Sequence, residues 1–149
     1  MNIDRRSVVA SVSTLGLALL TPFAKAETAL RKKIFSANPP STPPAVYSPA
    51  VAYGNLLFLA GKSSRGAAPG EIHADAKWVF DELEKELKNA GSSMDKVLKV
   101  NVALSNIKDY AALNEIFAAR FPKEPPVRTT IVAANPRGTT VEIDLVAYI

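Results

Sequence analysis

The sequence PPVRTTIVAANPRGTTVEIDLVAYI, residues 125–149, decides the fold of this chain. It contains two apolar runs, 129–133 and 140–148, separated by the turn-forming residues 135–138. β-Branched residues crowd both runs, so each is predicted to be a β-strand. Every second residue of the later run is apolar, which predicts one face that lies on a core, made of Val141, Ile143, Leu145 and Ala147.

Two charged side chains in this stretch suit a small-molecule site. Arg128 begins the first strand behind the stiff pair Pro125-Pro126, and Glu142 begins the other face of the second strand. A guanidinium and a carboxylate held on neighbouring core strands can bind a small carboxylate and activate a water. The same spacing also fits an ordinary ion pair at the strand ends, and spacing alone leaves the two interpretations open.

The first 26 residues are predicted to be an export signal. Asp4-Arg5-Arg6 precedes an apolar run, Val8 to Leu20, and Ala24-Lys25-Ala26 carries small residues where signal peptidase cleaves. The paired arginines also suit the twin-arginine route. We therefore expect cleavage after Ala26 and a single periplasmic domain, residues 27–149, that has no contact with the membrane. An uncleaved membrane anchor is the alternative.

Composition excludes several kinds of chemistry. The chain has 149 residues, 48% of them hydrophobic, which is enough to bury a core without disulfides. It has no cysteine and one histidine, His73, so neither a thiolate nucleophile nor a multi-histidine metal site is expected. Without Arg5, Arg6, Lys25 and Asp4 the net charge falls from +4 to +2. No basic patch or aromatic platform stands out, so nucleic acid is not expected as a partner.

The rest of the chain alternates between strand and helix patterns. The expected strands are a short one at 32–35, a hairpin formed by 50–53 and 56–60, and one at 97–104. Residues 61–64 are expected to form a loop at the end of the hairpin. The strand at 97–104 should bury Leu98, Val100, Val102 and Leu104. Helices are expected at 73–90, which has an apolar stripe, and at 108–120, where Asn114 is a poor helix former.

A collinear set of short motifs lies between residues 47 and 144, and the similarity that it carries covers about residues 32–149. The set consists of Tyr47-Ser48-Pro49-Ala50-Val51, Gly54-Asn55-Leu56-Leu57-Phe58, Ala60-Gly61, Ala90-Gly91, Asn114, Pro126-Val127-Arg128-Thr129 and Val141-Glu142-Ile143-Asp144. No single motif is specific, but together they resemble the RidA/YjgF family of reactive-intermediate (enamine/imine) deaminases. Some members of that family are called endoribonuclease L-PSP.

The resemblance implies an α+β fold of the chorismate-mutase type, a mixed β-sheet with two helices packed on one face, assembled as a homotrimer. It also implies that another strand separates the last two strands, which otherwise look like a hairpin. Active sites in the family lie in clefts between subunits. The resemblance implies no metal and no cofactor.

The resemblance also implies roles for six residues. Arg128 would grip the substrate carboxylate, and Glu142 would place or activate the attacking water. Tyr47 would lie near the pocket mouth, and Gly61 would bring its backbone close to the ligand. Two further positions correspond to substrate-binding residues, namely Asn114 on the second helix and Thr130 beside the arginine.

Three functions follow, in order of preference. The first is hydrolytic deamination of small reactive 2-imino acids or enamines to 2-oxo acids and ammonia, without a cofactor. The second is an exported trimer that binds small carboxylates, or acts as a chaperone, without turnover. Lys62 stands where the family usually has glutamine and could add a second positive charge for that role. Ribonuclease activity comes third, because the chain has a single imidazole and a nearly balanced charge.

Overall fold

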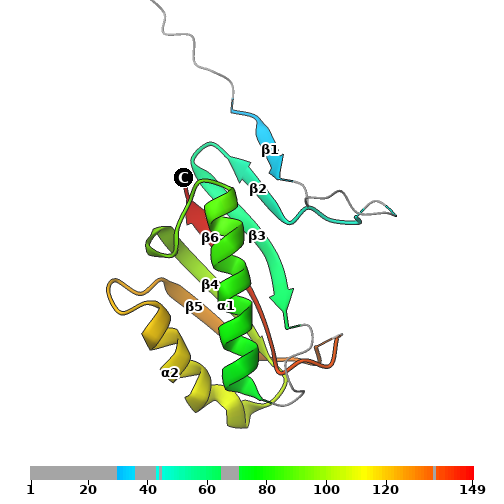
Figure 1. Cartoon of the computed structure of the whole chain (residues 1–149), viewed down its shortest axis with the longest axis vertical. Helices are drawn as coiled ribbons and strands as arrows, with labels where there is room; N and C mark the ends of the chain where they lie inside the picture. Colours follow the sequence, from blue (N-terminus) through cyan, green and yellow to red (C-terminus); the bar gives the residue numbers. More distant parts are fainter. Residues whose placement is uncertain (1–29, 36–42, 44, 65–70, 136) are drawn as a thin grey trace, which may run out of the picture.

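The computed structural model describes residues 30–35, 43, 45–64, 71–135 and 137–149, so the predicted export signal lies outside the described residues. The described residues form one mixed sheet and two α-helices (Figure 1). The strands are β1 (Lys32–Phe35), β2 (Ala50–Tyr53), β3 (Leu56–Ser63), β4 (Val97–Leu104), β5 (Val127–Val132) and β6 (Val141–Tyr148). The helices are α1 (Ile72–Asn89) and α2 (Tyr110–Arg120). Within the described ranges, no helix is both long and apolar enough to span a bilayer.

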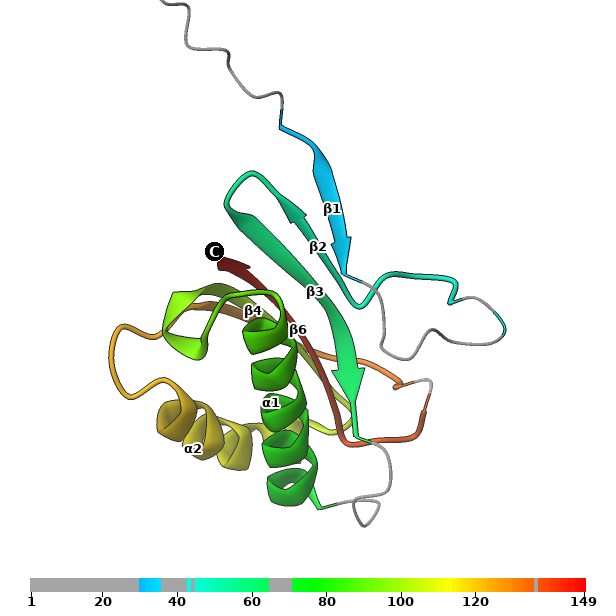
Figure 2. The ribbon, with the colours of Figure 1, turned by 45° about the horizontal axis from the view of Figure 1, so that its top comes forward.

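The strands follow the order β1-β2-β3-β6-β4-β5 across the sheet (Figure 2). Only β4 and β5 are described as a parallel pair, and α2 lies in the connection between them. The last strand, β6, pairs antiparallel with β3 on one side and β4 on the other. Because β4 lies between β5 and β6, the last two strands do not form a hairpin, as the resemblance implied.

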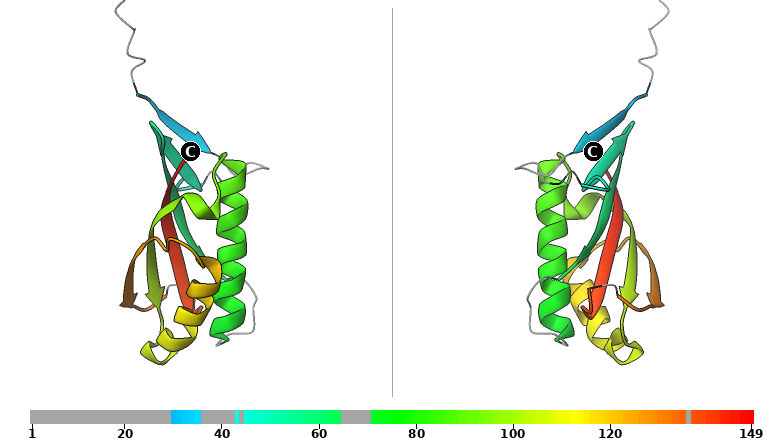
Figure 3. Two further views of the ribbon diagram at one scale, coloured as in Figure 1. Left: turned by 90° about the vertical axis from the view of Figure 1, so that its left-hand side faces the viewer. Right: turned by 90° about the vertical axis from the view of Figure 1, so that its right-hand side faces the viewer.

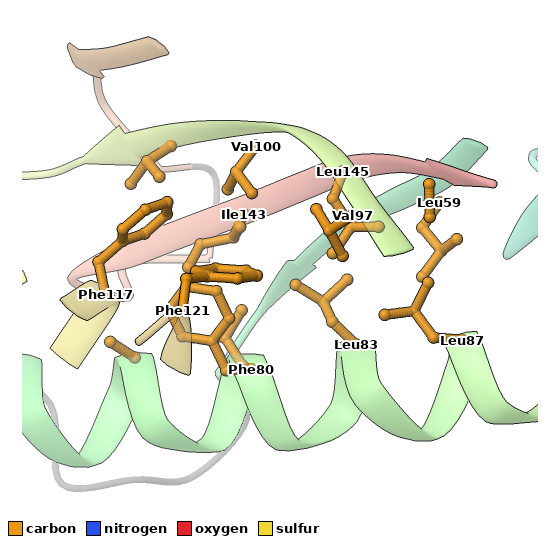
Figure 4. Close-up of a cluster of buried hydrophobic side chains, with 14 of the residues drawn as sticks. Leu59, Phe80, Leu83, Leu87, Val97, Val100, Phe117, Phe121, Ile143 and Leu145 are labelled. Carbon is orange, nitrogen blue, oxygen red and sulfur yellow. The ribbon is translucent and has the colours of Figure 1, made fainter. Parts of the chain in front are cut away.

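Both helices cover the same face of the sheet (Figure 3). The predicted apolar face of β6 is confirmed, since Val141, Ile143, Leu145 and Ala147 are all buried. Phe80, Leu83 and Leu87 of α1 pack against this apolar face of the sheet (Figure 4). The ring of Phe80 also meets Phe117 and Phe121 edge-on, with centroids 6.2 and 6.0 Å away, and this contact joins α2 to the same core.

Two irregularities in the sheet correct predictions made from the sequence, one of a loop and one of a buried face. Residues 61–63 continue β3 rather than forming a loop, and the register shifts between Leu59 and Lys62. A second shift occurs between Val97 and Lys99, so Val97 is buried and Leu98 is exposed, the opposite of what was expected. An extra residue in one strand shifts the side chains around it to the other face, which explains why Leu98 is exposed.

We call the face of the sheet opposite the helices the open face. Its large apolar side chains are partly exposed, namely Tyr53, Leu56, Phe58, Val127, Ile131 and Tyr148. Among the described residues, no helix packs on this face (Figure 3). Polar residues of β4 and β6, among them Asn101 and Asp144, lie between these apolar side chains. Exposed apolar side chains on a sheet face that no helix covers are typical of a surface that contacts another protein chain.

Candidate functional site

Arg128 lies on the helix side of β5, opposite the buried Val100 of β4. Its Nη2 atom donates a hydrogen bond to Asn114 Oδ1 at 2.6 Å and another to the Tyr110 hydroxyl at 3.3 Å. Both partners belong to α2, one helical turn apart, so they reach the guanidinium from the same side. The side chain is half-buried and its direction is set by α2.

Aromatic rings also support the guanidinium. The guanidinium carbon lies 4.6 Å from the centroid of the Phe117 ring and 5.6 Å from that of Tyr110. The Phe117 ring in turn packs on Phe121, with 4.8 Å between centroids, and both rings belong to the core. A cation held over an aromatic face is attracted by the ring quadrupole. The core therefore fixes the cation before any ligand arrives.

The helix α2 that carries these partners is itself anchored on α1. The Arg120 guanidinium contacts Asp81 and Glu84 of α1. A hydrogen bond from Lys77 and the nearby Arg120 charge lower the pKa of the Asp81 carboxyl below its ordinary value. This ion-pair network and the aromatic cluster hold Asn114 in place relative to β5.

The position of Asn114 explains why a poor helix former stands in the middle of α2, because its amide oxygen is the closest partner of Arg128. The contact of Tyr110 with the guanidinium was not predicted from the sequence. The signal was present in the sequence, since Tyr110 and Asn114 are four residues apart and share a helix face. We call Arg128, Asn114, Tyr110 and Phe117 the arginine group.

Thr130 follows Arg128 by two residues and faces the same side of β5, opposite the buried Val102. Its Oγ1 atom is buried and has no hydrogen-bond partner among the described residues. A buried hydroxyl of this kind usually finds a partner. Thr130 therefore lies beside the arginine group with a buried hydroxyl that has no hydrogen-bond partner among the described residues.

Glu142 lies on the other side of the sheet. It is flanked in β6 by the buried residues Val141 and Ile143, so its side chain extends over the open face. The carboxylate lies directly over the backbone of Gly61, where a Cβ atom would come within 2.6 Å of Glu142 Oε1. Gly61 belongs to the irregular part of β3, and the absence of a side chain there makes room for the carboxylate.

Tyr47 is 60% exposed and precedes β2 by three residues. The carbonyl of Pro49 accepts a hydrogen bond from the Ala60 amide at 2.9 Å, so the chain before β2 runs beside the irregular part of β3. Tyr47 thus belongs to the segment that approaches Gly61. We call Glu142, Gly61 and Tyr47 the glutamate group.

One chain does not bring the arginine group and the glutamate group together. Arg128 pairs with Val100 of β4, and Val100 pairs with Leu145 of β6. Glu142 pairs instead with Ala103, three residues further along β4. With β4 between them, their Cα positions are about 14 Å apart, and the two side chains leave opposite faces of the sheet. The ion pair between them is therefore excluded within one chain, and the idea that they stand on neighbouring strands was wrong.

The structure also gives Lys62 a role that the sequence did not indicate. The register shift in β3 turns its side chain to the helix side, where Nζ lies 2.8 Å from Glu86 Oε1 of α1. The lysine is thus neutralised by a helix residue and faces away from Glu142. The idea that Lys62 adds a second positive charge for a binding-only role has no support from this geometry.

The mixed six-stranded sheet with two helices on one face defines a class of small α+β protein. The family model described as Endoribonuclease L-PSP matches residues 37–149. The chain belongs to this family, which is the RidA/YjgF family suggested by its motifs.

Relatives from distant organisms match most of the chain. It is 34% identical over 108 residues to the protein mmf2, mitochondrial, of Schizosaccharomyces pombe, covering 68% of this chain and 86% of that protein. It is 35% identical over 107 residues to the 2-iminobutanoate/2-iminopropanoate deaminase of Mus musculus, covering 68% and 79% respectively. The crystal structure of RidA from an Antarctic Psychrobacter superposes with a TM-score of 0.69 at 33% identity, covering 80% of this chain and all of that one.

Proposed function

We propose that this protein hydrolyses small 2-imino acids, the tautomers of reactive enamines, to 2-oxo acids and ammonia. The observation that carries the proposal is the guanidinium of Arg128, which is oriented by Asn114 and supported by Phe117 before a ligand binds. Both of its described hydrogen bonds use Nη2, so the N–H groups of Nη1 and Nε are left to bind a substrate carboxylate. Relatives named 2-iminobutanoate/2-iminopropanoate deaminase support the same reaction.

The proposed site is completed by a second copy of the chain. Arg128 of one subunit would bind the substrate carboxylate, and Glu142 of another would face the imine carbon. This arrangement follows from the position of the two groups on opposite faces, and the apolar open face supplies a contact surface. The homotrimer that the resemblance implies would produce such sites at each subunit boundary.

The chemistry needs only water and a group that transfers protons. Water adds to the carbon of the C=N bond, and the resulting carbinolamine loses ammonia to leave the 2-oxo acid. In the first step Glu142 moves one proton from the attacking water to the imine nitrogen. In the second it moves the hydroxyl proton to the departing amine. Partial exclusion of water at a subunit boundary would strengthen both charges.

Two variants test the proposal. We expect Arg128→Ala to weaken binding of 2-oxobutyrate, measured by titration calorimetry, by about 2–4 kcal/mol, roughly a hundredfold or more, since the charge-assisted contact to the carboxylate is lost. Glu142→Gln should retain this binding, while turnover of a freshly generated imino acid falls by about 10²–10⁴-fold. Neither change should unfold the protein, which melting temperatures would check.

The matched controls are Arg137→Ala, which removes an exposed arginine from the turn before β6, and Asp144→Asn on the same strand face as Glu142. Both should behave like the unchanged protein in titration and turnover. If 2-oxobutyrate binds to Arg128→Ala as tightly as to the unchanged protein, Arg128 does not bind the substrate carboxylate. Binding without any turnover by the unchanged protein would favour the alternative, a trimer that binds carboxylates or acts as a chaperone.

The proposed location is the periplasm, after cleavage of the export signal at Ala26. The support is the pattern of charged, apolar and small residues in the first 26 positions. An exported deaminase would meet imino acids and enamines outside the cytoplasm.

A further inference from the structure

Asp75 is a buried acidic residue that neither group of the proposed site uses. It is 1% exposed and lies in the first turn of α1, where the positive end of the helix dipole favours a carboxylate. Its Oδ1 accepts a hydrogen bond from Ser64 Oγ at 2.5 Å. Its Oδ2 accepts two more, from Thr140 Oγ1 at 2.6 Å and from the Thr140 backbone amide at 3.2 Å. A carboxylate buried to this degree requires such partners.

These donors come from two strand ends that flank Glu142. Ser64 directly follows Ser63, the last residue of β3, and Ser63 is the residue paired with Glu142. Thr140 directly precedes β6 and lies two residues before Glu142, about 7 Å along the strand. The end of β3 and the start of β6 and of α1 meet at one end of the molecule (Figures 1 and 2). Asp75 thus links both strands that determine where the glutamate carboxylate lies.

The placement of Glu142 depends on these two strands remaining in register. Its carboxylate lies over Gly61 in the irregular part of β3, so a shift between β3 and β6 changes where the oxygens point. The Thr140 carbonyl also accepts a hydrogen bond from the Ser105 amide at 2.8 Å, which fixes the same residue to the end of β4. Two strands and a helix are therefore held around one side chain, that of Asp75.

We propose that Asp75 is a positioning residue for Glu142, acting through Thr140 and Ser64. The predicted effect on turnover rests on the proposed deaminase function. The predicted effect on the positions of β3 and β6 does not depend on that function. Asp75 touches no substrate. Asp75 holds the backbone that positions Glu142, the proposed general base. Arg128 lies on the face of the sheet opposite Glu142, and its position does not depend on Asp75.

The test compares Thr140→Val, which removes the hydroxyl but keeps the shape, with Thr140→Ser, which keeps a hydroxyl. Asp75→Asn provides a second perturbation. The matched control is Ser92→Ala, because the buried Ser92 hydroxyl donates to the Tyr148 carbonyl at 2.6 Å, at the opposite end of β6. All four proteins are purified as the full mature chain, and their melting temperatures are recorded.

We expect Thr140→Val and Asp75→Asn to lower kcat by about tenfold to a hundredfold, as misplacement of a reacting group does, and to leave KM and 2-oxobutyrate titration unchanged. Thr140→Ser should retain the kcat of the unchanged protein. Ser92→Ala should lose thermal stability without losing kcat. Hydrogen exchange in Thr140→Val should become about three- to tenfold faster at residues 61–64 and 139–142, and remain unchanged at the far end of β6.

An unchanged kcat in Thr140→Val, or an equal loss in Ser92→Ala, would overturn the proposal, because the effect would then be general destabilisation or none. Absence of turnover in the unchanged protein would refute the deaminase function instead. In that event hydrogen exchange decides the positioning claim by itself. Exchange at residues 61–64 and 139–142 that is the same in Thr140→Val and the unchanged protein would refute it.

Discussion

Gly61→Ala is the change that most directly tests how the glutamate group is built. A Cβ atom at this position would lie 2.6 Å from Glu142 Oε1 and 3.3 Å from both Cδ and Cγ of the same side chain. Ordinary van der Waals contact begins at 3.4 Å, so the carboxylate oxygen must move by about 0.8 Å or more. The atoms in the way belong to a flexible side chain, so the glutamate rather than the backbone should yield.

The expected effects on stability and on turnover therefore differ in size. An off-rotamer Glu142 costs about 0.5–1.5 kcal/mol, and replacing a glycine by alanine in an unstrained conformation returns about 0.4–1 kcal/mol. The free energy of unfolding should thus change by no more than about 1 kcal/mol. Misplacement of a catalytic group by about 1 Å costs roughly 10²-fold in rate. We expect Gly61→Ala to lose about a hundredfold in kcat while its melting temperature changes little.

The assay is turnover of a freshly generated 2-imino acid, together with urea unfolding of the same samples. The double variant Gly61→Ala/Glu142→Ala provides the control, because the contact disappears with the side chain. In that background Gly61→Ala should no longer reduce stability, so the two changes should be coupled. Full activity in Gly61→Ala, or additive effects in the double variant, would show that the glutamate does not lie over residue 61.

Three further outcomes are expected. Lys62→Gln should lower the free energy of unfolding by less than about 1 kcal/mol in urea titrations and leave turnover unaffected, since Lys62 pairs with Glu86 on the helix side; a large loss of turnover would contradict this placement. The mature chain should be a trimer by light scattering because its open face is apolar, and a monomer at micromolar concentration would remove the composite site. Intact-mass measurement of the exported protein should give a chain that begins at Glu27, whereas an exported full-length chain would refute cleavage.

Much of the local structure could be predicted because local periodicity records which side chains meet the core. The alternation in β6 identified its buried face, and the apolar stripe located α1 to within one residue at each end. Asn114 was singled out because its residue type disfavours a helix, and in the structure it bonds to Arg128. Each of these features depends on residues that are close together in the sequence.

The relation between strands could not be read in that way. One register shift exposed Leu98, which alternation predicted to be buried, and another lies in β3 where a loop was predicted at Lys62, because an irregularity in one strand depends on the strand paired with it. The position of β4 between β5 and β6 separates Arg128 from Glu142, and the pairing of Arg128 with the buried Val100 puts it on the face opposite Glu142. In strands whose apolar and polar residues alternate without interruption, such as β6, sequence alone determined which face is buried. Only tertiary structure decided which side chains share a site, because strand order and register arise from contacts between residues distant in the chain.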